Sequence, residues 1–204
     1  MTPIPISLAV EDSLSESVLR RVLEYTRRPF AVGPVFSRGG FGYLRRNVHG
    51  WNAAAKGSPL LLLTDLDSEA CPPALMQSWM TVAKHDNFLF RVAVREVEAW
   101  LLADHVGLAG FLSVNAKSFP AEPEALLDPK RKLVEIASLS KRKQIREDIV
   151  PRKGTTASQG PGYNRCLCEF VRDTWNIEAA ELRATSLKKT IDRVISFTPT
   201  WTNG

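Results

Sequence analysis

Cysteine is scarce in this chain of 204 residues, and its three copies show no metal-binding spacing. Cys71, Cys166 and Cys168 form an odd set, which indicates reduced thiols and predicts a cytoplasmic protein. Small buried hydrophobic side chains are the simplest interpretation of all three.

Long apolar runs are also missing. None approaches the ~18 residues that a membrane span needs, so we expect no membrane partner. Residues 1–13 lack the basic flank, apolar core and cleavage site of a signal peptide, and we interpret them as holding the first strand. Apolar residues make up 44% and charged residues 24%, the balance of one soluble domain, alone or with a small appendage.

Several catalytic motifs are absent as well. The three histidines share no metal spacing, and no nucleophile-elbow sequence supports a Ser-His-Asp hydrolase. Residues 154–160, GTTASQG, lack the Gly-Lys-Ser/Thr ending of a P-loop. The chain is therefore not expected to hydrolyse nucleoside triphosphates itself.

What is present is an alternation of short apolar runs and amphipathic segments. The pattern predicts strands at 4–10, 30–36, 59–65 and 87–96, and helices at 14–28 (with Ser13 as a possible N-cap), 43–56, 72–85 and 97–108. Such alternation is typical of an α/β fold, with a parallel sheet, right-handed crossovers and helices on both faces. The segment PLLLLTD is apolar on both faces, so we expect residues 59–64 to form a central strand.

After residue 112 the pattern changes. We therefore divide the chain into an α/β core at 1–112 and a basic, mostly helical C-terminal extension at 113–204, packed on the core. The extension is predicted to hold a basic helix at about 130–142, a Gly and Ser loop at 155–164, and two closing helices that break near Asn176 or Ile177.

Acidic residues follow three of the predicted strands. Glu11 ends the first strand, Asp65 and Asp67 end the third, and Glu96 and Glu98 follow the fourth. The carboxyl ends of parallel strands meet at one edge of a sheet, so we expect these groups to converge there. Asp65 and Asp67 are two residues apart, which places them on the same side of an extended chain. Crowded carboxylates repel one another unless a cation holds them, and oxygen ligands without His or Cys favour Mg²⁺ or Mn²⁺.

A simpler alternative exists for each acid. An Asp after a buried strand is also a common helix N-cap, and Glu96 and Glu98 stand where a helix dipole favours negative charge. Arg95, beside these acids, is suited equally to neutralising a phosphate and to pairing with a carboxylate.

The blocks AVEDSLSE, DLD and VREVEAWLLAD, in this order and context, resemble the Toprim domain. The chain is more closely similar to a bacterial family of Toprim-like proteins often encoded beside an AAA-type ATPase. The segments DPKRKL, GPGYNRCLCEFV and SLKKTIDRV extend the resemblance over most of the chain. The resemblance implies a Toprim-like, Rossmannoid parallel sheet, as in topoisomerases, primases and OLD-family nucleases.

The resemblance also implies roles for the acids. Glu11 matches the first-motif Glu, which serves as a metal ligand or a proton carrier, and Asp65 and Asp67 match the Asp-x-Asp that holds the metal. Glu96 or Glu98 would be the later acidic ligand of nuclease members. The sequence departs from the family at Asp12, where a Gly is usual, and at Ser15-Glu16, which stands one residue late.

The segment 128–154 is rich in Lys and Arg, and the formal net charge of the whole chain is +5. It is the best candidate for contacting a phosphate backbone, although a solvated helix face explains it equally well. Lys153-Gly154 and the SQGPGY loop either lie close to a ligand or form an ordinary loop. The residues expected to contact nucleic acid are Arg95, Lys141, Arg142, Lys143 and Lys153.

Taken together, the residues and the resemblance predict a Mg²⁺-dependent nuclease acting on DNA or RNA, with Glu11, Asp65, Asp67, Glu96 and Glu98 as its catalytic acids. The resemblance implies an effector of an anti-phage or toxin-like system, governed by an AAA-type ATPase partner. Two alternatives stay open. One is a non-catalytic partner subunit of an ATPase complex, and the other is a Mg²⁺-dependent phosphohydrolase acting on small phosphates.

Overall fold

The computed structural model describes residues 2–37 and 39–201, and their contacts divide the chain into two units. The first unit comprises Met1–Val94 together with Lys189–Gly204, and the second is Arg95–Lys188. This division differs from the boundary at residue 112 that the change in sequence pattern predicts. The reason is that α4 (Val97–Ala103), which follows the last strand, packs against later helices of the second unit, while the C-terminal segment returns to the first.

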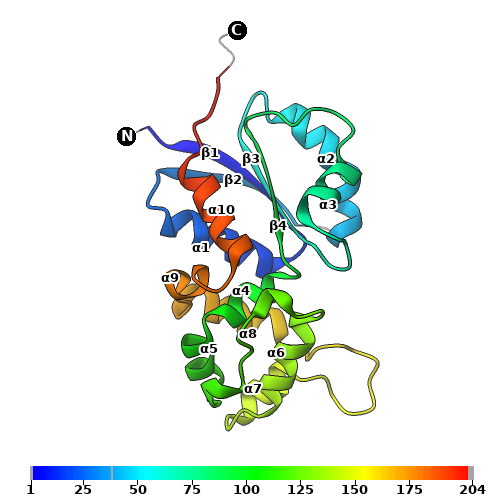
Figure 1. Ribbon diagram of the computed structural model, residues 1–204, viewed down its shortest axis with the longest axis vertical. Coiled ribbons are helices and arrows are strands. Elements are labelled where there is room, and N and C mark those ends of the chain that lie inside the picture. Colours follow the sequence, from blue (N-terminus) through cyan, green and yellow to red (C-terminus); the bar gives the residue numbers. More distant parts are fainter. Residues whose placement is uncertain (1, 38, 202–204) are drawn as a thin grey trace. The chain divides into compact units, whose positions relative to one another are not determined.

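The first unit holds a parallel sheet of four strands, as far as the described residues go, in the order β2-β1-β3-β4 (Figure 1). These strands are β1 (Ile4–Ala9), β2 (Phe30–Phe36), β3 (Leu60–Asp65) and β4 (Phe88–Ala93). β3 pairs with β1 on one side and with β4 on the other, so the predicted parallel sheet with an interior third strand is confirmed.

Helices cover both faces of this sheet. α2 (Gly40–Ala54) and α3 (Pro72–Trp79) lie on one face, where Trp51 and Trp79 join a core cluster with Leu60 and Leu62 of β3. Leu61 and Leu63 alternate with those leucines, so they point to the other face, which α1 (Ser13–Tyr25) covers (Figure 1). All four leucines are buried, as expected for a central parallel strand.

The C-terminal segment is fastened to the sheet by polar contacts. The Arg28 guanidinium donates to the carbonyl oxygens of Val194 (3.0 Å), Ile195 (2.9 Å) and Phe197. The fully buried Asn87 side chain donates to the Thr200 carbonyl at 2.7 Å and accepts from the Thr200 amide at 2.8 Å. Residues 189–200 are therefore part of the sheet unit, although the second unit separates them from it in sequence.

Several helix ends differ from the sequence-based expectation. The N-cap of α1 is Asp12 and not Ser13, because the Asp12 carboxylate accepts from the Ser15 amide at 2.9 Å. α2 begins earlier than predicted, at Gly40, where Phe41 packs edge-on against Trp79 and supports the first turn. α3 ends at Trp79, since the following residues 81–84 are exposed and offer no apolar face to bury.

The predicted helix at 97–108 is also divided. Asp104 ends α4 and begins α5 (His105–Leu112), because its carboxylate accepts from the amides of Gly107 and Asn176, each at 2.9 Å. One buried carboxylate thus caps a helix and binds a second segment of the unit.

The second unit is built of short helices. They are α4, α5, η1 (Ala116–Ser118), η2 (Pro123–Ala125), α6 (Pro129–Ser138), α7 (Lys143–Ile149), α8 (Tyr163–Asp173), α9 (Ile177–Glu181) and α10 (Thr185–Ile195), whose sequence crosses into the first unit. The basic helix ends at Ser138, earlier than predicted, and α7 is separate. The predicted break at Asn176 is confirmed, since its side chain caps α9 by accepting from the Ala179 amide at 3.1 Å.

A loop of residues 150–162 joins α7 to α8 and returns to its starting point. The Gly160 amide donates to the Ile149 carbonyl at 2.8 Å, and the Gly162 amide donates to the Asp148 carbonyl at 2.9 Å. A Cβ at Gly160 would collide with the backbone oxygens of Asp148 and Val150, so a glycine is required for this close approach.

None of the described helices is long and apolar enough to cross a bilayer.

Two glycine substitutions in the second unit should therefore have opposite effects. Gly160→Ala should lower the free energy of unfolding by roughly 1–3 kcal/mol, because backbone has to move to admit the methyl group. A methyl group at Gly110, an exposed position of α5, meets no atom, so Gly110→Ala should raise the free energy of unfolding by about 0.5–1 kcal/mol. Thermal or urea unfolding of both variants measures the difference, and equal effects would contradict the described loop.

Candidate functional site: carboxylates at the strand ends

The strand order creates a switch point between β1 and β3. From β1 the chain moves to β2 on one side, and from β2 it crosses back to β3 on the other side of β1. The helices after β1 and β3 accordingly lie on opposite faces of the sheet. In open parallel sheets, ligands bind outside the carboxyl ends of the strands at such a point. Glu11 and Asp65 stand at the carboxyl ends of these two strands.

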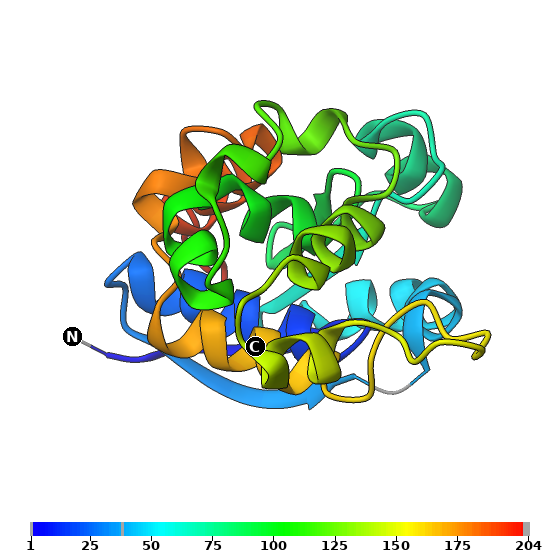
Figure 2. The same cartoon turned by 90° about the horizontal axis from the view of Figure 1, so that it is seen from below.

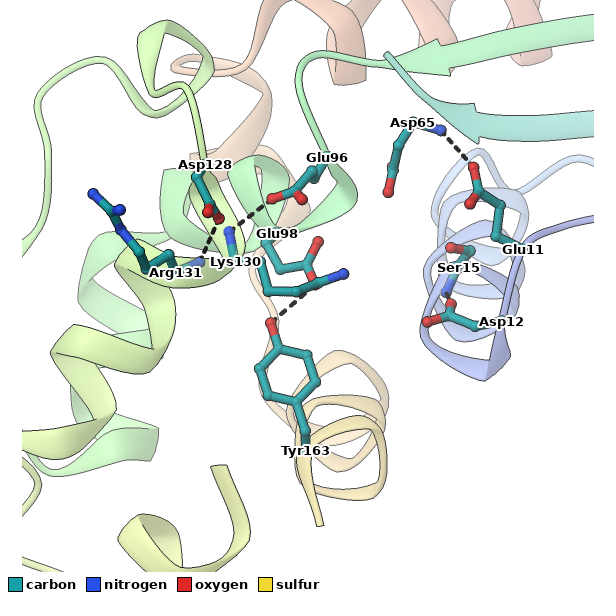
Figure 3. A network of polar contacts seen from close by, with 10 residues as sticks. All are labelled: Glu11, Asp12, Ser15, Asp65, Glu96, Glu98, Asp128, Lys130, Arg131 and Tyr163. Carbon is teal, nitrogen blue, oxygen red and sulfur yellow. Dashed lines mark hydrogen bonds and ion pairs between the residues drawn. The ribbon is translucent and has the colours of Figure 1, made fainter. Parts of the chain in front are cut away.

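Glu11 is held in place by the end of β3. Its Oε1 accepts a hydrogen bond from the Asp65 amide at 3.0 Å (Figure 3). The same oxygen accepts another from the Thr64 hydroxyl at 2.6 Å. Burial raises the pKa of Glu11 above its ordinary value of 4.5, the two hydrogen bonds oppose that rise, and the charges of Asp67 and Asp12 add to it. The side chain is thus a positioned carboxylate within the field of neighbouring acids.

The position of Asp67 differs from the one that its spacing to Asp65 predicts. β3 ends at Asp65, and Asp67 lies in a turn with φ 49, so the chain is not extended between the two aspartates. Asp65 is half-buried and Asp67 is exposed. The charge of Asp67 still acts on Glu11, because it adds to the rise in the pKa of Glu11. The structure therefore brings Glu11 into contact with Asp65 at one end of the sheet, and Asp67 lies in the turn that follows β3.

Glu16 behaves differently from these acids. It pairs with Arg20 one helical turn along α1, at 2.8 Å, and its carboxylate is committed to that contact. Asp12, where the resembled family has Gly, serves as the helix cap.

Glu96 and Glu98 lie in the second unit, where Lys130 contacts both. The Glu96 Oε2 accepts from the Lys130 backbone amide at 2.8 Å, and the Lys130 Nζ lies 3.6 Å from the Glu98 Oε1. The same Glu98 oxygen accepts from the Tyr163 hydroxyl at 2.9 Å (Figure 3). Glu98 and Tyr163 are almost fully buried, at 2% and 1% exposure. A buried carboxylate needs such partners, because desolvation of the unpaired charge is costly.

The environment of Glu96 raises its pKa to about 7. Burial is the main cause and the adjacent charge of Glu98 adds to it, while the Lys130 amide acts in the opposite direction. Glu96 occupies the N-cap position of α4, yet its side chain makes no capping hydrogen bond there. The Glu96 side chain therefore does not cap α4, although its place at the start of the helix still suits the helix dipole.

Sequence reasoning missed three partners of these acids, namely Thr64, Lys130 and Tyr163. Thr64 directly precedes Asp65, so a hydroxyl at a strand end was an available signal. Lys130 follows the Asp-Pro pair that opens α6, where Asp128 caps the helix by accepting from the Arg131 amide at 2.7 Å. Tyr163 follows the Gly-Pro-Gly turn that opens α8. No short-range pattern connects either residue to Glu98.

The residues expected to contact nucleic acid differ in their exposure. Arg95 is the half-buried first residue of the second unit. Lys141, Arg142, Lys143 and Lys153 are exposed, but the Arg142 guanidinium donates to the Phe111 carbonyl at 3.1 Å and Lys143 pairs with Glu147 at 3.5 Å. Lys143 and Lys153 line a common groove, whereas Lys141 and Arg142 do not.

The carboxylates fit a hard cation in their chemistry. Glu11, Asp65 and Asp67 offer oxygen donors from two adjacent strand ends, with no His or Cys among them. Throughout residues 2–37 and 39–201, however, no three His, Cys, Asp or Glu side chains are gathered closely enough to hold a metal ion as they stand. The donor set thus matches Mg²⁺ or Mn²⁺ by type.

No family model, curated protein or solved structure matches this chain.

The effects of the Thr64 hydrogen bond and of the Asp67 charge on the pKa of Glu11 should be separable by substitution. Asp67→Asn should lower the pKa of Glu11, because it removes a neighbouring negative charge, and Asn tolerates the positive φ of this position. Thr64→Val should raise the pKa of Glu11, because it removes a bond to the ionised form, and Thr64→Ser should not. Carboxyl ¹³C titration in EDTA measures these shifts. Shifts of the same sign for Asp67→Asn and Thr64→Val would contradict the arrangement.

The raised pKa of Glu96 predicts a pH-dependent stability. The folded state binds the proton more tightly than the unfolded chain, so the stabilisation is present below about pH 4.5 and is lost as the pH rises through about 7. Glu96→Gln should remove this contribution to the pH dependence, while its amide oxygen can still accept from Lys130. Urea unfolding from pH 4.5 to 8 compares the two proteins. An identical pH dependence in both would refute the assignment.

Proposed function

We propose that this protein is a divalent-cation-dependent nuclease, in which Glu11, Asp65 and Asp67 hold Mg²⁺ or Mn²⁺. The observation that carries the proposal is the meeting of Glu11 with the end of β3 at the switch point of the sheet, within the field of Asp67. Helix capping does not explain these three acids. The helices that follow β1 and β3 do not use them as caps, because Asp12 caps α1 and α3 begins at Pro72 with no side-chain cap.

In this proposal the residues at the strand ends have different roles. The Thr64 hydroxyl and the Asp65 amide orient Glu11, and Asp65 and Asp67 supply further oxygen donors. A bound Mg²⁺ or Mn²⁺ would supply Lewis acidity toward a phosphodiester and a water of lowered pKa. Thr64 is thus a positioning residue, and the acids are the ligands.

The resemblance to Toprim nucleases supports a wider proposal. Glu96 and Glu98 would be the later acidic residues of the nuclease members, and an AAA-type ATPase would be the partner that governs activity. The protein would then act as the effector of an anti-phage or toxin-like system, on DNA or RNA. The basic segment 128–154 supports a nucleic acid over a small phosphate as substrate.

Metal binding is tested by thermal melts with and without Mn²⁺. The wild type should gain about 5–10 °C at roughly a hundredfold excess over the dissociation constant, because the cation binds the folded state alone. Asp67→Asn should lose this gain while its melting temperature in EDTA stays equal or rises, since one repelling charge is removed. Glu24→Gln, an exposed acid near the other end of α1, is the matched control and should respond like the wild type.

Cleavage of supercoiled plasmid and of single-stranded RNA in Mn²⁺ completes the experiment. Wild type and Glu24→Gln should cleave at equal rates, and Asp67→Asn should be slower by about a hundredfold or more. If Mn²⁺ does not stabilise the wild type and Asp67→Asn destabilises it, Asp67 is a structural turn residue and the proposal fails. Metal binding without cleavage would instead support the non-catalytic partner subunit.

A further inference from the structure

The second unit contains a groove between α7 and the 150–162 loop. Its volume is about 800 Å³, and it is lined by Ser138, Lys143, Gln144, Arg146, Glu147, Asp148, Val150, Pro151, Arg152, Lys153 and Pro161. Figures 1 and 2 show the loop, in yellow, extending away from α7 and α8. Helix and loop therefore form two walls that come from one continuous stretch of sequence.

The lining is cationic. Four basic side chains face two carboxylates, and the carboxylate of Asp148 is already engaged. It accepts from the Gln144 amide at 3.0 Å, and the Arg165 guanidinium lies 2.7 Å away. The hydrogen bond from Gln144, with Arg165 beside it, lowers the pKa of Asp148. Its charge is thus neutralised within the protein, so the groove keeps a positive balance.

The cations on the loop wall are available to a ligand. Arg152 and Lys153 are exposed, and no carboxylate in the described part of the chain pairs with either of them. Arg146 differs, because its guanidinium donates to the Ser140 carbonyl and helps to hold the start of α7. Lys143 shares its charge with Glu147 at 3.5 Å, in a contact exposed to water.

The groove has a fixed base. Gly160 and Gly162 donate to the carbonyls of Ile149 and Asp148, so the loop leaves α7 and returns to it at the same place. The apolar part of the lining is Val150, Pro151 and Pro161, and it includes no aromatic ring. Bases bound without sequence preference normally stack on aromatic side chains. This groove therefore suits the phosphates of a ligand and not its bases.

We propose that the groove between α7 and the 150–162 loop binds the sugar-phosphate backbone of a nucleic acid, with Arg152 and Lys153 as its principal phosphate contacts. The proposal rests on the proposed nuclease function and deepens it, because it names where the substrate backbone lies. Arg152 was not among the contacts expected from sequence, and Lys141 and Arg142 lie outside the lining. Binding here is electrostatic and independent of base sequence.

The test is fluorescence anisotropy with a labelled single-stranded DNA oligonucleotide of mixed sequence, in EDTA, over a salt series. Arg152→Gln/Lys153→Gln should flatten the slope of log K against log salt by about 1.4, since two phosphate contacts are lost, and should weaken binding roughly 20-fold at about 0.1 M salt. The matched control is Lys117→Gln/Arg131→Gln, which removes the same charge from exposed positions of the same unit outside the groove. The control should bind as the wild type does.

Two outcomes would overturn the proposal. Equal losses in both double variants would mean that overall charge, and not the groove, attracts DNA, and no loss in either would mean that the groove is not used. Polyglutamate of matched charge should compete weakly. Competition equal to that of the oligonucleotide would overturn the nucleic-acid assignment in favour of an acidic protein partner.

A cleavage assay on the same variants separates this proposal from the proposed function. Groove-dependent binding in EDTA without Mn²⁺-dependent cleavage by the wild type would support the groove and refute the nuclease. Cleavage by a wild type whose binding does not depend on Arg152 and Lys153 would support the nuclease and refute the groove.

Discussion

The burial of β3 on both faces is the constraint on which the candidate site depends. Leu60 to Leu63 are almost completely buried, with at most 3% exposure, and the strand lies inside the sheet between β1 and β4. Thr64 is still buried, and the chain first meets partial exposure at Asp65. The polar end of the strand is thus presented at the carboxyl edge. Because β1 is the neighbour, the first side chain available to meet that end is Glu11. An apolar strand that runs straight into two aspartates is consistent with this geometry.

In the second unit the acids are stabilised by burial together with specific polar partners. Glu98 is withdrawn from water and compensated by Tyr163 and Lys130, whereas Glu96 is bound by a backbone amide and keeps a pKa of about 7. Lys130 serves both carboxylates with different atoms, so the start of α6 and the start of α4 form one polar cluster. Two carboxylates two residues apart in sequence thereby lie in different surroundings, one bound by a hydroxyl and an ammonium group and the other by a backbone amide.

Local patterns predicted the sheet unit well and the second unit less well, for physical reasons. Hydrophobic alternation and strand-end acids report burial and chain direction, so the parallel sheet, the interior β3 and the position of Glu11 and Asp65 were accessible from sequence. The order of the strands was not, because the pairing of β1 with β3 depends on tertiary packing. The split of one predicted helix at Asp104, and the contacts of Lys130 and Tyr163 with Glu98, join residues 32 to 72 positions apart. No local periodicity encodes such pairs. The unit boundary differs for the same reason, since residues 189–200 return to a sheet that ends at Ala93.

That return has a consequence for how the protein is made. The Nη1 of Arg28 donates to carbonyls near residue 195, and the hydrogen bonds of the buried Asn87 amide are completed by Thr200. During synthesis the four strands leave the ribosome before residues 194–200, so Arg28 and Asn87 lack these later partners until that segment has emerged. The second unit, in contrast, is a single uninterrupted segment and can finish folding earlier. The sheet unit is therefore completed only after the second unit has been synthesised. A chain that stops short of residue 200 leaves the buried Asn87 side chain with the Ala55 carbonyl but without the Thr200 backbone.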